Sequence, residues 1–319
     1  MARHIGKPFN MHYKLSKRKT FLLLPLTIAF VIMAAFRFAG NALHPLEPLS
    51  QHYKTLSELN PLPNSSRAWM DTIRYPWAEY GKGAQGNTLW RTVYLGGEPE
   101  AILPGLVTPP ANSSDQTRAE LDYLLRLQQN RTPQEVAQAQ YIANIGSWPN
   151  ILNPEDPDFQ ENRKQLFYIA SSVGEWYNDK NFPVTTELLL NCIQDIRVTE
   201  FRLKWHFKRA RPYHLEPALK PLARISSPSF ASGHSLWAFS EAFLFAEIIP
   251  ERRADFLKMA EEVRWSRELM GIHYPSDNEA SRVISWNLLS AWSKNPAFVE
   301  ALKKARKEWK DWNKSNQRK

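Results

Sequence analysis

TELLLNCIQDIRVTEFRLKWHFK, residues 186–208, has the strongest helical pattern in the chain. Its apolar residues recur at helical spacing and fall on one broad face, which holds Leu188, Leu189, Cys192, Ile193, Ile196 and Phe201. We therefore predict a long helix here. Pro212 disfavours helical geometry at Arg211, so the helix should end shortly before that point.

Helical patterns also occupy the sequence on either side of this segment. Residues 115–129 place leucines at mostly three- and four-residue spacing, and Thr132–Glu135 is a capping box with proline at the first helical position. Further helices are expected over 165–177, 235–249, 251–270, 275–292 and 296–312. Strand-like alternation is nearly absent, so the sequence predicts an all-α helical bundle.

Composition and charge exclude several classes of protein. The chain has 319 residues, of which 43% are hydrophobic, enough for one large or two modest domains. Of the net charge of +9, residues 1–19 carry +6 and residues 302–319 carry another +6, which leaves −3 for the body. Nucleic-acid binding by the globular part is therefore not expected. Cys192 is the only cysteine, which excludes an intrachain disulfide and a cysteine-based metal cluster.

The N-terminus has the layout of an export signal. The basic block of residues 1–19 leads into sixteen uncharged residues, Phe21–Phe36, which Arg37 closes. Gly40-Asn41-Ala42 offers a small-x-small cleavage site, whereas residues 20–37 could instead remain as a single membrane anchor. Both alternatives export the remainder of the chain. The Pro-rich residues that follow are expected to form an extended stem or a wrapping segment, with a short helix near 66–73.

The first of three polar clusters is Lys204-x6-Arg211-Pro212 at the end of the long helix. The two cations lie about two turns apart and can project to one side, which would make an anion clamp. The alternative is an ordinary solvated basic face, because Lys208 and Arg209 lie nearby.

The second cluster, Ser232-Gly233-His234, directly precedes an apolar helix. A glycine-containing turn at a helix N-terminus presents free backbone N–H groups to an anion, so phosphate oxygens could bind Ser232 and Gly233. His234 at its edge could donate a proton to a leaving oxygen. A simple helix cap is the alternative.

The third cluster combines Arg267, His273 and Asp277. Gly271 should end one helix, and Pro275 should open the next with Asp277 in its first turn. Asp277 can then accept one imidazole N–H of His273 and stabilise the cation that forms when the other nitrogen attacks phosphorus. The alternative is a structural His–Asp pair at a helix cap.

In this order, the three clusters resemble the signature of the type-2 phosphatidic acid phosphatase superfamily. That superfamily includes bacterial class A nonspecific acid phosphatases, membrane lipid phosphatases and vanadium haloperoxidases. The resemblance is strongest to the class A acid phosphatases: Gly271–Asp277 matches the third motif almost letter for letter, and Leu106–Asp115 with Arg131 looks like the start of their helical core. It covers roughly residues 103–295 and implies a helical bundle of the acid phosphatase/vanadium haloperoxidase type.

The resemblance implies a role for each residue that matches a motif. Lys204, Arg211 and Arg267 would hold the phosphoryl oxygens together with Ser232 and the Gly233 amide. His273 would attack and become phosphohistidine, Asp277 would support it, and His234 would protonate the leaving group. The chain departs from the family at Ala231, where proline is usual, and at Ser235, where threonine is frequent. We expect both to flank the turn without supplying a contact.

The expected activity is that of a metal-independent phosphomonoester hydrolase working through a phosphohistidine. Its substrate would be a small phosphorylated molecule. We expect no cofactor, because three side-chain cations supply the positive charge that a metal ion would otherwise provide. One alternative is a vanadium haloperoxidase that binds vanadate as its cofactor in the same pocket; in the phosphatase, vanadate would be an inhibitor. Another is a noncatalytic phosphate-binding or membrane-surface protein. The sequence carries no indication of oligomeric state.

The expected organisation has four segments. These are the signal or anchor of residues 1–42, the stem or wrapping segment of 43–102, the catalytic domain of 103–295 and a basic amphipathic helix within 296–319. The apolar stripe of this last helix either packs on the core or docks on a membrane surface. The resemblance places the exported part in a bacterial periplasm or on the outer face of the inner membrane.

Overall fold

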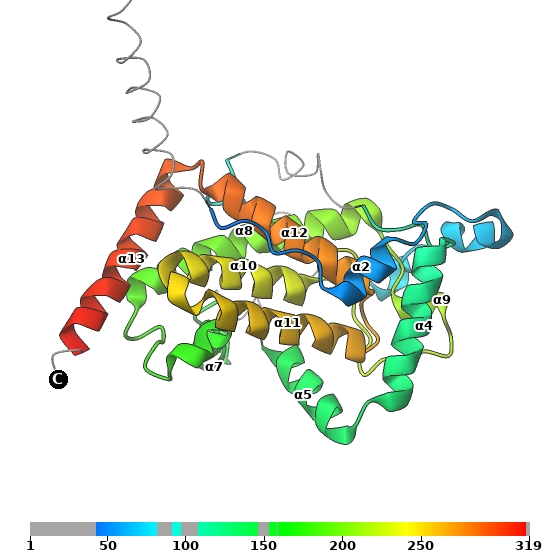
Figure 1. Ribbon diagram of the computed structural model, residues 1–319, viewed down its shortest axis with the longest axis horizontal. Coiled ribbons are helices and arrows are strands. Elements are labelled where there is room, and N and C mark those ends of the chain that lie inside the picture. Colours follow the sequence, from blue (N-terminus) through cyan, green and yellow to red (C-terminus); the bar gives the residue numbers. More distant parts are fainter. Residues whose placement is uncertain (1–42, 82–90, 97–107, 146–152, 158, 317–319) are drawn as a thin grey trace, which may run out of the picture. The chain divides into compact units, whose positions relative to one another are not determined.

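The computed structural model describes residues 43–81, 91–96, 108–145, 153–157 and 159–316 (Figure 1). Every regular element in these ranges is a helix, so the predicted all-α fold is confirmed. The arrangement described below is that of the compact unit that begins at Leu46. The expected signal or anchor at 20–37 lies outside the described residues. Within the described ranges, none of the helices combines the length and apolar character needed to cross a membrane.

Helix α10, Gly233–Ile248, occupies the centre of the bundle. All of its residues except His234 are buried, as expected for a helix that is apolar all round. It packs against α11 (Arg253–Leu269), α12 (Pro275–Trp292) and α8 (Pro183–Phe207) (Figure 1). Helix α8 is the long helix predicted from the apolar stripe at 186–208, and α12 has the predicted bounds.

Helix α11 also contacts α4 (Asp115–Asn130) and α5 (Pro133–Asn144). The predicted capping box is present at the start of α5, where Thr132 and Glu135 each accept a hydrogen bond from the other's backbone N–H. This cap fixes the entry of α5, whose last turn forms one wall of the pocket described below.

The single helix predicted over 165–177 is wrong. The chain forms α7 (Phe159–Gln165) and a separate 3₁₀ turn, η5 (Tyr168–Val173), which ends at Gly174 with φ 134°. That backbone conformation is accessible mainly to glycine, and it ends the helical geometry before Trp176 and Tyr177. Both aromatic side chains are then free to pack against the C-terminal helix.

The N-terminal part of the unit lies against the bundle. Helix α2 (Gln51–Ser57) contacts α4 and α12, and it buries Tyr53 and Leu56. Two 3₁₀ segments follow, η1 (Ser65–Thr72), close to the helix expected at 66–73, and η2 (Trp77–Glu79). Neither α2 nor the short α9 (Pro212–Leu215) was predicted, because seven- and four-residue helices carry too little periodicity.

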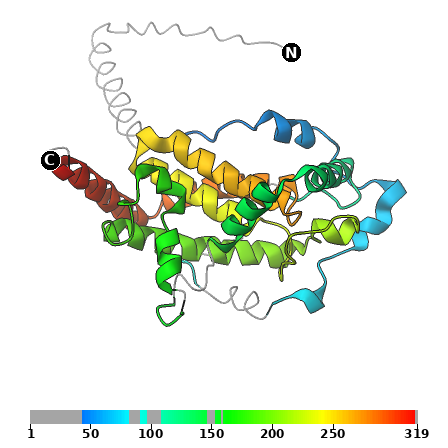
Figure 2. The same cartoon turned by 90° about the horizontal axis from the view of Figure 1, so that it is seen from below.

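The C-terminal helix α13, Pro296–Asn316, packs on α8 and α10 (Figure 2). Its apolar stripe is buried at Phe298, Leu302, Ala305 and Trp309. The ring of Trp309 stacks on Trp176 with the ring centroids 6.0 Å apart. Glu308 accepts hydrogen bonds of 2.9 Å from the backbone N–H groups of Val184 and Thr185, so α13 also caps the start of α8.

We expect Trp309→Ala to lower the free energy of unfolding by about 3 kcal/mol, because it removes a buried aromatic side chain that packs on Trp176, Tyr177 and Phe182. Urea unfolding measures this change. The matched control is Lys310→Ala, which removes an exposed side chain of the same helix. Unchanged stability together with weaker binding to anionic liposomes would instead assign the stripe to membrane docking.

Candidate active site

A pocket of about 330 Å³ lies where the C-terminal end of α8, the start of α10 and the end of α11 meet. The predicted site residues that line it are Lys204, Arg211, Gly233, His234, Arg267 and His273. Ser232 and Asp277 are fully buried behind the pocket wall. The structure therefore brings together all three sequence clusters, which are spread over more than seventy positions of the chain.

Lys204 is held at one side of the pocket by two backbone carbonyl groups. Its ammonium group donates hydrogen bonds to Pro228 O at 2.8 Å and to Ala231 O at 2.7 Å. Burial, and then the charge of Arg211, lowers the pKa of Lys204 to about 7. The contact to Ala231 corrects the expectation that this position supplies none. The carbonyl acts here, so replacement of the usual proline does not remove the interaction.

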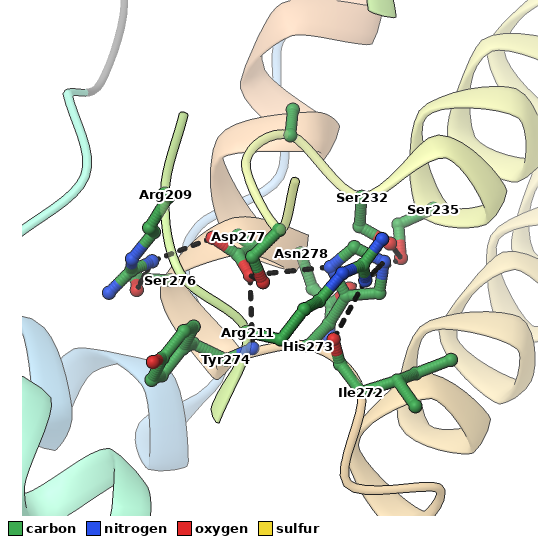
Figure 3. Close-up of polar contacts among 12 residues, drawn as sticks. Arg209, Arg211, Ser232, Ser235, Ile272, His273, Tyr274, Ser276, Asp277 and Asn278 are labelled. Carbon is green, nitrogen blue, oxygen red and sulfur yellow. Dashed lines mark hydrogen bonds and ion pairs between the residues drawn. The ribbon is translucent and has the colours of Figure 1, made fainter. Parts of the chain in front are cut away.

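Arg211 fixes the tautomer of His273. Its Nη1 lies 2.9 Å from His273 Nε2 and also donates to Ile272 O at 2.8 Å (Figure 3). A guanidinium group cannot accept a hydrogen bond, so Nε2 must carry the lone pair and Nδ1 the proton. Burial and the charge of Arg211 lower the pKa of His273 well below its usual value. The imidazole is therefore neutral, with its lone pair on Nε2, where it accepts the hydrogen bond from Arg211.

Asp277 lies on the opposite side of the His273 ring. Its Oδ2 accepts the Nδ1–H of His273 at 3.3 Å and the hydroxyl of Ser229 at 2.5 Å, and its Oδ1 accepts from Arg209 Nη1 at 2.6 Å. Figure 3 shows Arg209 and the His273 ring on either side of the carboxylate. Burial alone would raise the pKa of Asp277, but Arg209 and these hydrogen bonds outweigh it and hold the pKa well below the ordinary value.

Arg209 is a residue that the sequence interpretation missed. It entered the sequence interpretation only with Lys208, as support for the alternative of a solvated basic face, yet it is 4% exposed and stacks over the Tyr274 ring at 3.9 Å. Buried Glu120 of α4 lies 3.6 Å behind it and accepts a hydrogen bond from the Ser276 hydroxyl. Lys208 does remain exposed. One signal was present, the spacing Arg209-Ala210-Arg211: side chains two positions apart in an extended segment can point to the same side, so that Arg209 reaches Asp277 while Arg211 reaches His273.

The Ser232-Gly233-His234 turn begins α10 as predicted, with Ser232 at the N-cap. The Ser232 hydroxyl donates to the Ser235 hydroxyl at 3.2 Å, and Ser235 donates to Asn278 Oδ1 at 2.8 Å. Ser235 therefore supplies contacts, contrary to expectation. Because no side chain caps this helix, the backbone N–H groups of its first turn remain directed toward an incoming anion.

His234 and Arg267 complete the wall facing α5. His234 Nε2 donates to Ala143 O at 3.2 Å, and Arg267 Nη2 donates to Ala139 O at 3.1 Å. Burial, and then Arg267, lowers the pKa of His234 to about 3, so this imidazole is neutral. Burial lowers the pKa of Arg267 to about 9, which leaves the guanidinium charged at neutral pH.

This arrangement suits an oxyanion. Three side-chain cations and a helix N-terminus surround a neutral imidazole whose lone pair lies on Nε2, while Ala223, Ile225, Met270 and Ile272 form an apolar rim. In the part of the chain that the structure describes, no group of three histidine, cysteine, aspartate or glutamate side chains could hold a metal ion. The positively charged side chains at the pocket are those of Lys204, Arg211 and Arg267.

Part of the chain is similar in sequence to known proteins. Residues 184–298 match the family model of the PAP2 superfamily. A non-specific acid phosphatase of Providencia stuartii is 30% identical over 147 residues, and one of Salmonella typhimurium is 29% identical over 167 residues. The first match covers 44% of this chain and 59% of the Providencia protein. The second covers 50% of this chain and 66% of the Salmonella protein.

Among solved structures, the apo form of a bacterial vanadium-dependent chloroperoxidase is similar in fold. The likeness has a TM-score of 0.50 at 9% identity and covers 69% of this chain and 56% of that chain. The family-model match confirms the resemblance to the superfamily, and the likeness in structure confirms the predicted fold type.

We expect Arg209→Met to lower the free energy of unfolding by about 3–5 kcal/mol, because it leaves the Asp277 carboxylate buried without its cation. Denaturant unfolding measures the loss. Lys208→Met is the matched control, since it removes the neighbouring exposed cation and should change stability little. Equal stabilities for the two variants would contradict the importance of the buried pair.

Proposed function

We propose that this protein is a phosphomonoester hydrolase that acts through a phosphohistidine intermediate on His273. The single observation that carries the proposal is the 2.9 Å contact between Arg211 Nη1 and His273 Nε2. It places an unprotonated imidazole nitrogen beside a cation at the wall of an oxyanion pocket. The relatives named as non-specific acid phosphatases support the same activity over the matched region.

The first step binds the phosphoryl group among Lys204, Arg211 and Arg267. A phosphoryl oxygen would also accept hydrogen bonds from the free N–H groups at the start of α10. Backbone carbonyl groups already hold all three cations in position, so little reorganisation accompanies binding. These charges stabilise the negative charge of the transition state and supply what a metal ion would otherwise provide.

The second step transfers the phosphoryl group to the enzyme. Arg211 Nη1 turns its hydrogen bond from His273 Nε2 to a phosphoryl oxygen, which frees the Nε2 lone pair. His273 Nε2 then forms a bond to phosphorus while the bond from phosphorus to the leaving oxygen breaks, and His234 gives its proton to that oxygen. Asp277 stabilises the positive charge that develops on the His273 ring. A water molecule, deprotonated by His234, then attacks phosphorus while the bond from phosphorus to His273 Nε2 breaks, which releases inorganic phosphate and restores both histidines.

His234 has to gain a proton before it can act as an acid. In the empty pocket its pKa is about 3, mainly because the ring is buried and secondly because Arg267 is nearby. A bound phosphoryl dianion opposes both effects, since a nearby negative charge favours the imidazolium ion. His234 is therefore proposed to take up its proton together with the substrate, which favours turnover at acidic pH.

The proposed substrate is a small phosphomonoester and the proposed location is outside the cytoplasm. The apolar rim of the pocket makes few demands on the leaving group, which suits broad specificity. The basic block and apolar run of residues 1–37 support export.

Hydrolysis of p-nitrophenyl phosphate by the full chain tests the proposed activity. We expect phosphate release that persists in excess EDTA and is inhibited by orthovanadate. Loss of activity on chelation, restored by zinc or magnesium, would contradict metal independence. Bromide oxidation by hydrogen peroxide in the presence of vanadate, without phosphate release, would instead identify a haloperoxidase.

We expect His273→Ala to lower kcat by roughly four orders of magnitude or more, because it removes the nucleophile. Phosphohistidine is labile in acid and stable in base. The wild-type reaction should therefore be quenched with alkali, and the protein should then be examined for phosphate bound to histidine. His206→Ala, which removes an exposed histidine of α8, is the control. Phosphate found on serine, or substantial turnover by His273→Ala, would overturn the mechanism.

The activity should also fall as the pH rises through about 7, because burial, with help from Arg211, lowers the pKa of Lys204 to about 7. Only the protonated ammonium group of Lys204 binds the phosphoryl group. Its deprotonation should therefore lower kcat/KM above this pH, whereas below it Lys204 should cause no loss. The pH profile of kcat/KM measures the effect. A profile that stays level to about pH 9 would show that Lys204 keeps its proton.

A further inference from the structure

Glu200 places a carboxylate inside the same pocket that holds the cations. It lies on α8 one turn before Lys204, and its side chain is 8% exposed. Glu200 Oε1 is 3.7 Å from Lys204 Nζ, whereas Oε2 is buried and meets no hydrogen-bond partner among the described residues. A buried carboxylate oxygen without a partner is unusual and calls for an explanation.

Gly233 shows how closely this carboxylate approaches the anion-binding turn. A Cβ atom at position 233 would lie 2.2 Å from Glu200 Oε1 and 2.5 Å from its carboxyl carbon. Only glycine therefore fits at the first position of α10 with Glu200 in place. The carboxylate thus borders the N–H groups that would receive a phosphoryl oxygen.

The charged and titratable groups around Glu200 come from every element that forms the pocket. They are Arg197 and Lys204 on α8, Arg211 before α9, His234 on α10, Arg267 on α11 and His273 before α12. Asp277 lies behind His273 and is satisfied by Arg209. Glu200 is thus the negatively charged side chain that lines the pocket itself, within the described part of the chain.

We propose that Glu200 makes anion binding by this pocket depend on its own protonation. As a carboxylate it repels a bound dianion; as a carboxylic acid it donates its O–H to an anion oxygen. Glu200 is accordingly the residue whose charge state sets how tightly the pocket holds a doubly charged anion. This inference rests on the proposed function, because it takes the same pocket to be the phosphoryl site.

If Glu200 acted mainly as the counter-ion of Lys204, removal of its charge would weaken anion binding instead of strengthening it. The carboxylate raises the pKa of Lys204, although burial and Arg211 outweigh it. A bound dianion takes over that role, because it is itself the counter-ion of Lys204 in the complex. The repulsion between Glu200 and the anion remains, so removal of the carboxylate charge should strengthen binding.

Sulfate is a suitable probe, because it keeps two negative charges across the pH range in which a carboxyl group ionises. Glu200→Gln removes the charge and retains the shape and a hydrogen-bond donor. Isothermal calorimetry on the full chain would compare wild type with this variant at about pH 4.5 and about pH 6.5, both below the pKa of about 7 that Lys204 has. Glu187→Gln, an exposed glutamate of the same helix, is the matched control.

We expect Glu200→Gln to bind sulfate at least about tenfold more tightly than wild type near pH 6.5 and about equally near pH 4.5. Glu187→Gln should match wild type at both values. Equal affinities of wild type and Glu200→Gln at the higher pH, or weaker binding by Glu200→Gln, would overturn the inference; the latter would assign Glu200 to Lys204 as its counter-ion.

The same measurements separate this inference from the proposed function. If the wild type binds sulfate and orthophosphate and hydrolyses p-nitrophenyl phosphate while Glu200→Gln behaves like wild type, only the role of Glu200 fails. If the wild type neither binds these anions at either pH nor hydrolyses the ester, the proposed phosphoryl site fails, and the inference fails with it.

Discussion

The buried ion pair between Arg209 and Asp277 is the contact on which the rest of the site depends. It joins the segment after α8 to the first turn of α12 through a bond of 2.6 Å, and neither side chain is more than 2% exposed. Asp277 also accepts from His273, Ser229 and the Tyr274 N–H, so one carboxylate fixes three chain segments. Such a pair remains ionised in the interior only because nearly every lone pair is used.

A second constraint is the burial of several like charges in one place. Lys204, Arg211 and Arg267 repel one another, and among the described residues only Lys204 has a carboxylate within ion-pair distance, that of Glu200 at 3.7 Å. Backbone carbonyl groups accept their hydrogen bonds instead, from the loop before α10, the loop before α12 and helix α5. Carbonyl dipoles orient the cations without cancelling their charge, which leaves a preorganised positive field for an anion.

The sequence predicted what depends on short-range spacing. The four-residue separation of His273 and Asp277 and the proline at the start of α12 were sufficient to place that pair. Arg209 could not be assigned in this way, because its partner is 68 positions away and an arginine beside Lys208 resembles an exposed one. The error over 165–177 has a similar origin, since Gly174 ends the helical geometry and the aromatic residues after it pack on distant α13.

Burial of these groups also couples anion binding to proton binding. It lowers the pKa of Lys204 to about 7 and that of His234 to about 3, so the empty pocket holds fewer protons than its residue types suggest. A bound anion raises the pKa of Lys204 and of His234, because a nearby negative charge favours their protonated forms. Binding must then draw protons from solvent, and by linkage a lower pH must strengthen binding. For the proposed phosphatase, burial of these titratable groups thus favours an acidic working range.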